Sequence, residues 1–184
     1  ESVSLHFDDE DRDCFLSEMM TTLFKLFASA CFFVVAVMPF IFPILVNEKY
    51  IDGYNHVLIL MYAMLFRVLV GMYSCIYIAT KQSNKVAITS ISAAVINLAV
   101  DLLCINKIGL YAASVSSLVA FLTMFIIRYF DVNRMVRMKI KRQVAVSSIL
   151  IGALLPLAYY SNHKIVQIAA LIITILYAVF VNMD

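Results

Sequence analysis

The stretch Lys85–Phe130 reads KVAITSISAAVINLAVDLLCINKIGLYAASVSSLVAFLTMFIIRYF and decides the fold class. It contains two long apolar runs joined by a short polar link, Asn106–Lys107. The first run holds an amide and a carboxylate four residues apart, Asn97 and Asp101. An apolar run of about 20 residues matches the thickness of a bilayer when it is helical. We therefore predict two membrane-spanning helices here, joined by a tight turn.

The whole chain shares this apolar character. Of its 184 residues, 64% are hydrophobic and 14% are charged, whereas about 25% are charged in an ordinary soluble domain. A chain this apolar cannot hide its surface in one water-soluble core, so a lipid bilayer is the expected partner. The four cysteines have no CxxC spacing, and we interpret them as small apolar residues. No signal peptide is visible, and we expect the chain to be a piece of a larger protein.

Six apolar segments are long enough to cross a membrane as helices. They are residues 26–46, 57–80, 86–105, 108–127, 144–161 and 165–181. Pro39 and Pro43 each remove a backbone donor from the first of them, so we expect that helix to kink or unwind near its end. Residues 1–22 carry an acidic cluster followed by apolar residues at helical spacing, which predicts either an amphipathic helix at the membrane surface or a solvated loop.

The basic residues favour one orientation in the membrane. If the basic segment 128–142 is cytoplasmic and anchors to anionic headgroups, the turn 81–85 and residues 1–25 lie on the same side. Ten basic residues are then inside and three outside. The short external links make the third and fourth spans, and the fifth and sixth, antiparallel hairpins. We predict an all-α integral membrane protein with six spans and both ends cytoplasmic. Its parts are a leader 1–22, a four-helix part 23–130, a basic cytoplasmic loop 131–142 and a terminal helix pair 143–184.

Three polar side chains inside the apolar runs are the candidate substrate-binding residues. Arg67 lies midway along its span, where a charge costs a few kcal/mol, so we expect an anion contact, with a structural ion pair or snorkelling toward the membrane surface as alternatives. Asp101 lies near the outer end of its helix, about 10 Å from Arg67 in depth, and has either a cation-coupling or a structural role. Asn97 shares the helix face of Asp101, which predicts a hydrogen bond to a neighbouring helix.

No other pattern indicates catalysis. His56 and His163 lack HExxH, DxD or Cys partners, and the sequence has no glycine-rich phosphate loop or Ser-His-Asp pattern. We predict no catalytic residue, no cofactor, no metal and no nucleic-acid partner. An integral-membrane enzyme such as a polysaccharide ligase or acyltransferase is an alternative, but its catalytic groups need a larger external loop than the links seen here. A purely structural subunit would leave Arg67 unexplained.

The segment AAVINLAVDLLCINKIGLYAASVSSLVA (93–120) has a mid-helix Asn97, a short break and a Gly-x-x-Ala-Ala start to the next helix. It resembles the penultimate core hairpin of the polysaccharide and lipid-linked oligosaccharide flippases, in the multidrug/oligosaccharidyl-lipid/polysaccharide exporter superfamily. The matching small residues are Gly109, Ala112 and Ala113. The preceding proline-bearing helix and the external NEKY link also fit this family, and the resemblance covers most of residues 15–130.

The resemblance implies the C-terminal half of a two-lobe transporter that works by alternating access, with the N-terminal lobe as a missing partner. Its substrate would be an undecaprenyl-pyrophosphate-linked oligosaccharide or polysaccharide precursor, moved across the bacterial inner membrane, and Arg67 would suit the pyrophosphate. Residues 143–182 would match the extra helix pair of longer members. Asp101 occupies a position where neutral residues are common in the family, so no coupling role is carried over. A cation-coupled multidrug exporter of the same superfamily is the alternative, and it would use acidic residues such as Asp101.

Overall fold

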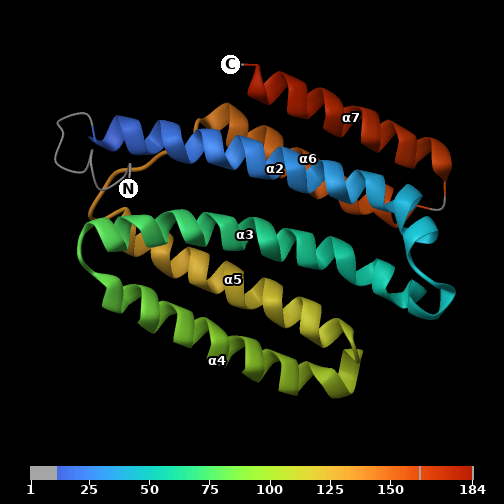
Figure 1. Ribbon diagram of the computed structural model, residues 1–184, viewed down its shortest axis with the longest axis horizontal. Coiled ribbons are helices and arrows are strands. Elements are labelled where there is room, and N and C mark those ends of the chain that lie inside the picture. The colour runs from blue at the N-terminus through green and yellow to red at the C-terminus, as the bar shows by residue number, and fades with distance from the viewer. Residues whose placement is uncertain (1–11, 162, 184) are drawn as a thin grey trace. The chain divides into compact units, whose positions relative to one another are not determined.

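The computed structural model describes residues 12–161 and 163–183, and their regular structure is entirely helical. Six helices are long and apolar enough to cross a membrane, as predicted, so the all-α architecture is confirmed (Figure 1). They are α2 (Arg12–Leu45), α3 (Tyr54–Ala79), α4 (Ser83–Ile108), α5 (Tyr111–Val132), α6 (Arg142–Tyr159) and α7 (Lys164–Asn182), with a short 3-10 helix η1 (Glu48–Gly53) before α3.

Helix α2 includes residues that the sequence assigns to a separate leader. It runs without interruption from Arg12, and Leu16 and Met20 are each only 1% exposed. The acidic cluster at 8–11 lies outside the described residues. The helix also continues through Pro39 and Pro43 to Leu45, so of the two predicted outcomes, a kink or unwinding, the unwinding does not occur. Proline's fixed φ is helical, and membrane helices tolerate the lost donor when neighbouring groups satisfy the freed carbonyl.

The link between α4 and α5 lies three residues later than predicted. Asn106 and Lys107 belong to the last turn of α4, and the chain turns at Gly109, whose φ is +56°. Glycine adopts this left-handed conformation without the steric cost of a Cβ. Lys107 in the last turn also interacts favourably with the negative end of the helix dipole. The polar pair Asn106–Lys107 is therefore a weaker turn signal than Gly109, two residues further along the chain.

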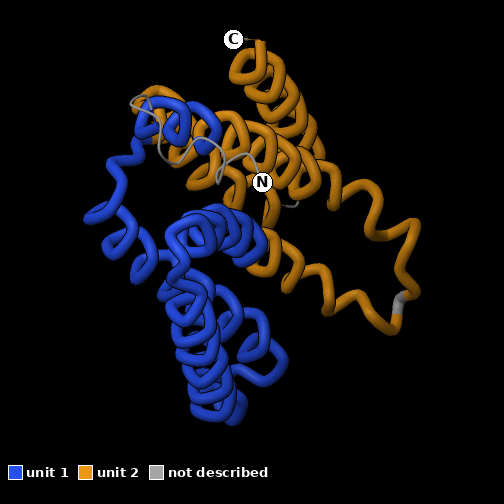
Figure 2. The backbone as a smooth tube through the Cα atoms, turned by 60° about the vertical axis from the view of Figure 1, so that its left-hand side comes forward, with its two compact units in different colours: residues 1–20, 62–139 blue, residues 21–61, 140–184 orange. Residues whose placement is uncertain are grey.

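The chain forms two compact units, which Figure 2 shows in different colours. The first contains residues 62–139 with the described part of 1–20, and the second contains 21–61 with the described part of 140–184. The terminal helices α6 and α7 contact each other and belong to the same unit as residues 21–61. In the second unit the Phe32 and Tyr177 rings are 5.7 Å apart, and the Tyr54 and Tyr159 rings stack at 4.4 Å.

Small residues bring α4 and α5 together in the first unit. Ala112, Ser114 and Ser116 on α5 are at most 2% exposed, so this part of α5 is buried. Ala93 of α4 and Ala120 of α5 belong to the same buried cluster. Side chains this small allow two helix backbones to approach closely. The close pairing holds the polar side chains of α4 in fixed positions beside α5.

Candidate functional site

Arg67 lies in the middle of α3, as predicted, and its side chain is exposed on the surface of the first unit. Its guanidinium carbon is 5.8 Å from the centre of the Phe121 ring on α5. A guanidinium over an aromatic face is attracted by the electrons of the ring. Among the described residues, no carboxylate lies within 4 Å of the Arg67 nitrogens. Arg67 therefore does not form the structural ion pair that was one alternative for it in this part of the chain, and its guanidinium contacts the uncharged ring of Phe121 instead.

Asn97 and Asp101 lie one turn apart on α4. The Asn97 amide nitrogen is 3.4 Å from the Ser117 hydroxyl, and the Ser116 hydroxyl is 3.5 Å from the Asn97 carbonyl oxygen, so the predicted interhelical contact is present with long distances. Asp101 is half-buried, and its Oδ1 atom is buried without a hydrogen-bond partner in the described structure. A buried carboxylate oxygen without a donor is costly, so Asp101 retains unused acceptor capacity.

The three predicted residues meet in one groove of about 530 Å³ between α3, α4 and α5. Its lining comprises Arg67, Ser90, Ala93, Ala94, Asn97, Leu98, Asp101, Ala120, Phe121 and Met124. Polar and apolar side chains alternate along its wall on α4, at the spacing of one helix face. The structure thus brings the three candidates together, although Arg67 comes from α3, Asn97 and Asp101 come from α4, and they lie up to 34 positions apart.

The groove separates its positive and negative charges. Asn97 of α4 contacts Ser117 of α5, so these two residues lie at the same height along the pair of helices. Phe121 lies one turn beyond Ser117 on α5, and Arg67 lies over Phe121. Because α5 follows α4 through a short link, that turn leads away from Asp101. Arg67 and Asp101 therefore occupy different levels, which explains why they form no ion pair.

Arg128 is the functional candidate that sequence reasoning missed. It was predicted to open the basic segment 128–142, but α5 continues to Val132 and Arg128 is only 1% exposed. That prediction is wrong because a guanidinium can be buried when its N–H groups are all hydrogen-bonded. The helical period carried the signal, since Ala120, Met124 and Arg128 follow at intervals of four and all three are buried.

All five N–H groups of Arg128 have acceptors on α3 and α4. Nε donates to Thr89 Oγ1 (3.0 Å), Nη1 to the Val70 carbonyl (3.1 Å) and to Ser74 Oγ, and Nη2 to the Val86 carbonyl (3.3 Å) and Ser90 Oγ (3.1 Å). None of these acceptors is a carboxylate. The buried positive charge is held by carbonyl and hydroxyl dipoles, and it ties three helices together at one point.

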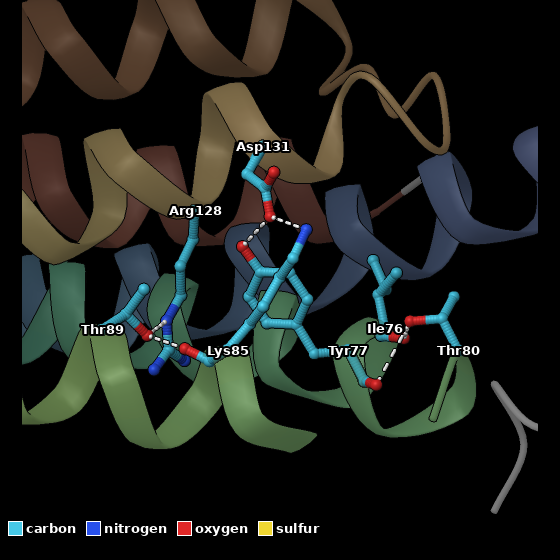
Figure 3. Close-up of polar contacts among 7 residues, drawn as sticks. All are labelled: Ile76, Tyr77, Thr80, Lys85, Thr89, Arg128 and Asp131. Atoms are coloured by element: carbon cyan, nitrogen blue, oxygen red, sulfur yellow. Dashed lines mark hydrogen bonds and ion pairs between the residues drawn. The ribbon is translucent and has the colours of Figure 1, made fainter. Parts of the chain in front are cut away.

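A second contact joins the same three helices one turn further along α5. Asp131 accepts hydrogen bonds from Lys85 Nζ and from the Tyr77 hydroxyl, each at 2.8 Å. Figure 3 shows Arg128 and Asp131 projecting from α5 toward side chains of α3 and α4. The Lys85 and Asp131 side chains are 41% and 31% exposed, so the ion pair alone contributes at most about 1 kcal/mol. Lys85, predicted as part of a basic turn, is therefore also a helix-to-helix contact.

The rest of the basic segment leads from α5 to α6. Arg134, Arg137 and Lys139 are exposed, as a solvated basic loop requires. The backbone N–H of Arg137 donates to Asp13 Oδ2 at 3.3 Å, and that of Lys139 donates to Ser17 Oγ at 3.1 Å. These bonds attach the loop to the start of α2 and leave its basic side chains free to point outward.

Comparisons of the chain with protein-family models, with curated proteins and with solved structures gave no match. The chemistry of the groove is then the basis for a function. The described residues contain no group of three His, Cys, Asp or Glu side chains that could hold a metal ion. What the groove offers is one exposed cation, one amide and one carboxylate, on helices that are apolar enough to lie in a membrane.

Proposed function

We propose that the chain is part of a membrane transporter that moves an undecaprenyl-pyrophosphate-linked oligosaccharide or polysaccharide precursor across the bacterial inner membrane. The observation that carries the proposal is the groove between three apolar helices that Arg67, Asn97 and Asp101 line together. A charge at the centre of a bilayer costs about 2.5 to 3.5 kcal/mol or more, so a cation there is expected to face a substrate path or another protein surface.

The chemistry of the groove suits a substrate with both an anionic group and hydroxyl groups. Arg67 has no carboxylate within reach in the described structure, so its donors are available to phosphate oxygens. Asp101 and Asn97 supply acceptors, which sugar hydroxyls satisfy. A pyrophosphate joined to a sugar places both kinds of group on one molecule.

The rest of the proposal follows the family resemblance. The spans form antiparallel hairpins within one lobe, a second lobe completes the cavity, and both ends of the chain are cytoplasmic. The chain then binds and moves its substrate by alternating access and carries out no covalent chemistry. The short link at Gly109 and the close packing of α4 on α5 support the hairpin arrangement.

A second candidate is a cation-coupled multidrug exporter, which one observation favours. Asp101 Oδ1 is buried and has no partner in the described structure, as a site that takes up a proton or a cation would require. For such an exporter, Asp101→Asn abolishes drug efflux driven by an ion gradient. Vesicles containing the full-length wild-type protein that show no such efflux exclude this candidate.

The test of the first proposal is export of the glycan in cells that depend on the full-length protein. Arg67→Ala should abolish export while the protein inserts at its normal level, and Arg67→Lys should retain part of it, because a lysine keeps the charge but loses the planar fork. Arg137→Ala is the matched control, since it removes an exposed arginine outside the groove. Unchanged export in Arg67→Ala would remove Arg67 from the substrate path.

A further inference from the structure

Ser90 belongs both to the groove and to the Arg128 cluster. Its exposed side chain lines the groove, and its Oγ accepts a hydrogen bond from Arg128 Nη2 at 3.1 Å. In the described structure its own hydroxyl proton has no acceptor. Two neighbours differ, because Thr89 donates to the Lys85 carbonyl at 2.7 Å and Ser92 donates to the Ile88 carbonyl at 2.9 Å. Ser90 therefore retains a donor at the groove wall.

The buried cation changes the character of this donor. A hydroxyl whose oxygen accepts a bond from a guanidinium is polarised, and its O–H group becomes a stronger donor. Arg128 is 1% exposed and has no carboxylate among its hydrogen-bond acceptors. None of its hydrogen-bond partners therefore carries an opposite charge, and Ser90 is the one of these acceptors that lines the groove.

We infer that the Ser90 end of the groove is an anion subsite in which Arg128 acts through the Ser90 hydroxyl, so that a substrate phosphate lies between Ser90 and Arg67. This inference rests on the proposed function and adds the orientation of the substrate. Arg128 does not touch the substrate and is a positioning residue. The anion receives one direct cation, Arg67, and one polarised hydroxyl.

The other end of the groove then receives the sugar. Ser90 and Asp101 are eleven positions apart on α4, a rise of about 16 Å. Arg67 lies over Phe121, at a level between them, and Asn97 comes next before Asp101. The order along the groove is therefore donor, cation, amide and carboxylate. A molecule bound with its phosphate at Ser90 presents its hydroxyl groups to the acceptors of Asn97 and Asp101.

Two substitutions separate this role from a merely structural one. Ser90→Ala and Thr89→Val each remove one hydroxyl acceptor from Arg128, but only Ser90 lines the groove. A third variant, Ser90→Thr, keeps a hydroxyl at this position. The assay uses the full-length protein in phosphatidylcholine vesicles and measures how well inorganic pyrophosphate displaces a fluorescent polyprenyl pyrophosphate.

Ser90→Ala should lower the affinity for inorganic pyrophosphate about tenfold to a hundredfold. The affinities of Thr89→Val and Ser90→Thr should stay within about threefold of the wild-type value. Arg128→Lys should lower the affinity for pyrophosphate when Ser90 is present. It should cause no further loss of affinity in the Ser90→Ala protein, because Arg128 acts through Ser90. Equal losses in Ser90→Ala and Thr89→Val would overturn the inference and leave a structural cluster.

Two further outcomes would also overturn it. If Arg67→Ala abolishes binding while Ser90→Ala binds as wild type does, the proposed function stands and the subsite does not. If phosphatidylglycerol displaces the probe as well as inorganic pyrophosphate does, the site binds bilayer headgroups instead of a substrate. Absence of any pyrophosphate binding by the wild-type protein would reject the proposed function itself.

Discussion

Replacing Arg128 by methionine tests how a buried cation without a carboxylate stabilises the helix bundle. The substitution removes five hydrogen bonds that join α5 to α3 and α4. At about 1.5 kcal/mol for each bond to a charged group, their sum is roughly 7.5 kcal/mol. Methionine avoids the desolvation of a buried charge, which costs several kcal/mol. We expect a net loss of about 2 to 4 kcal/mol in the free energy of unfolding.

The assay is reversible unfolding of the full-length protein by denaturing detergent in mixed micelles, followed by circular dichroism. Arg137→Met is the control, because Arg137 is exposed and its structural bond comes from the backbone N–H, which the substitution keeps. It should change the free energy of unfolding by less than about 0.5 kcal/mol. If Arg128→Met is as stable as the wild type, the five bonds only compensate the burial of the charge, and the cluster does not stabilise the bundle.

Two smaller predictions test the link and the second unit. Gly109→Ala should destabilise the protein by about 1 kcal/mol or more, because alanine is strained at φ +56° although a Cβ there meets no other atom within 4 Å. Thermal unfolding in detergent measures this loss, and an unchanged melting temperature would contradict the prediction. Tyr177→Phe should lose about 1 kcal/mol, because Ser148 donates to the Val144 carbonyl and so accepts from Tyr177 at 2.6 Å. Tyr129→Phe, at an exposed ring, is its control in the same unfolding assay, and equal effects would refute the assignment.

The apolar runs predict the helices because length and composition alone decide whether a segment can cross a bilayer. They also identify Arg67, Asn97 and Asp101 as candidate site residues, since a polar group inside such a run is costly and needs a polar partner or a substrate path beside it. They place the link one helix turn too early, because Asn106 and Lys107 are polar but helical, whereas Gly109 reverses the chain.

Arg128 could not be placed in the same way. An arginine near the end of a span is equally compatible with a solvated loop and with a buried cluster, and the partners decide between them. Those partners are two carbonyls and three hydroxyls on helices up to 58 positions away along the chain. Hydroxyls such as Ser90 and Thr89 are common in membrane helices, so their spacing alone gives no signal. The missing information was the register of α4 against α5.

We propose that the groove between α3, α4 and α5 receives a pyrophosphate-linked glycan. Leu98 and Leu103 are both exposed on α4, but only Leu98 lines the groove. Leu98→Cys and Leu103→Cys, each in a full-length protein without other cysteines, allow the labelling rate with a small thiol reagent to be measured in vesicles. We predict that the lipid-linked glycan slows labelling at position 98 and leaves the labelling rate at position 103 unchanged. Equal rates with and without the glycan at position 98 would contradict it.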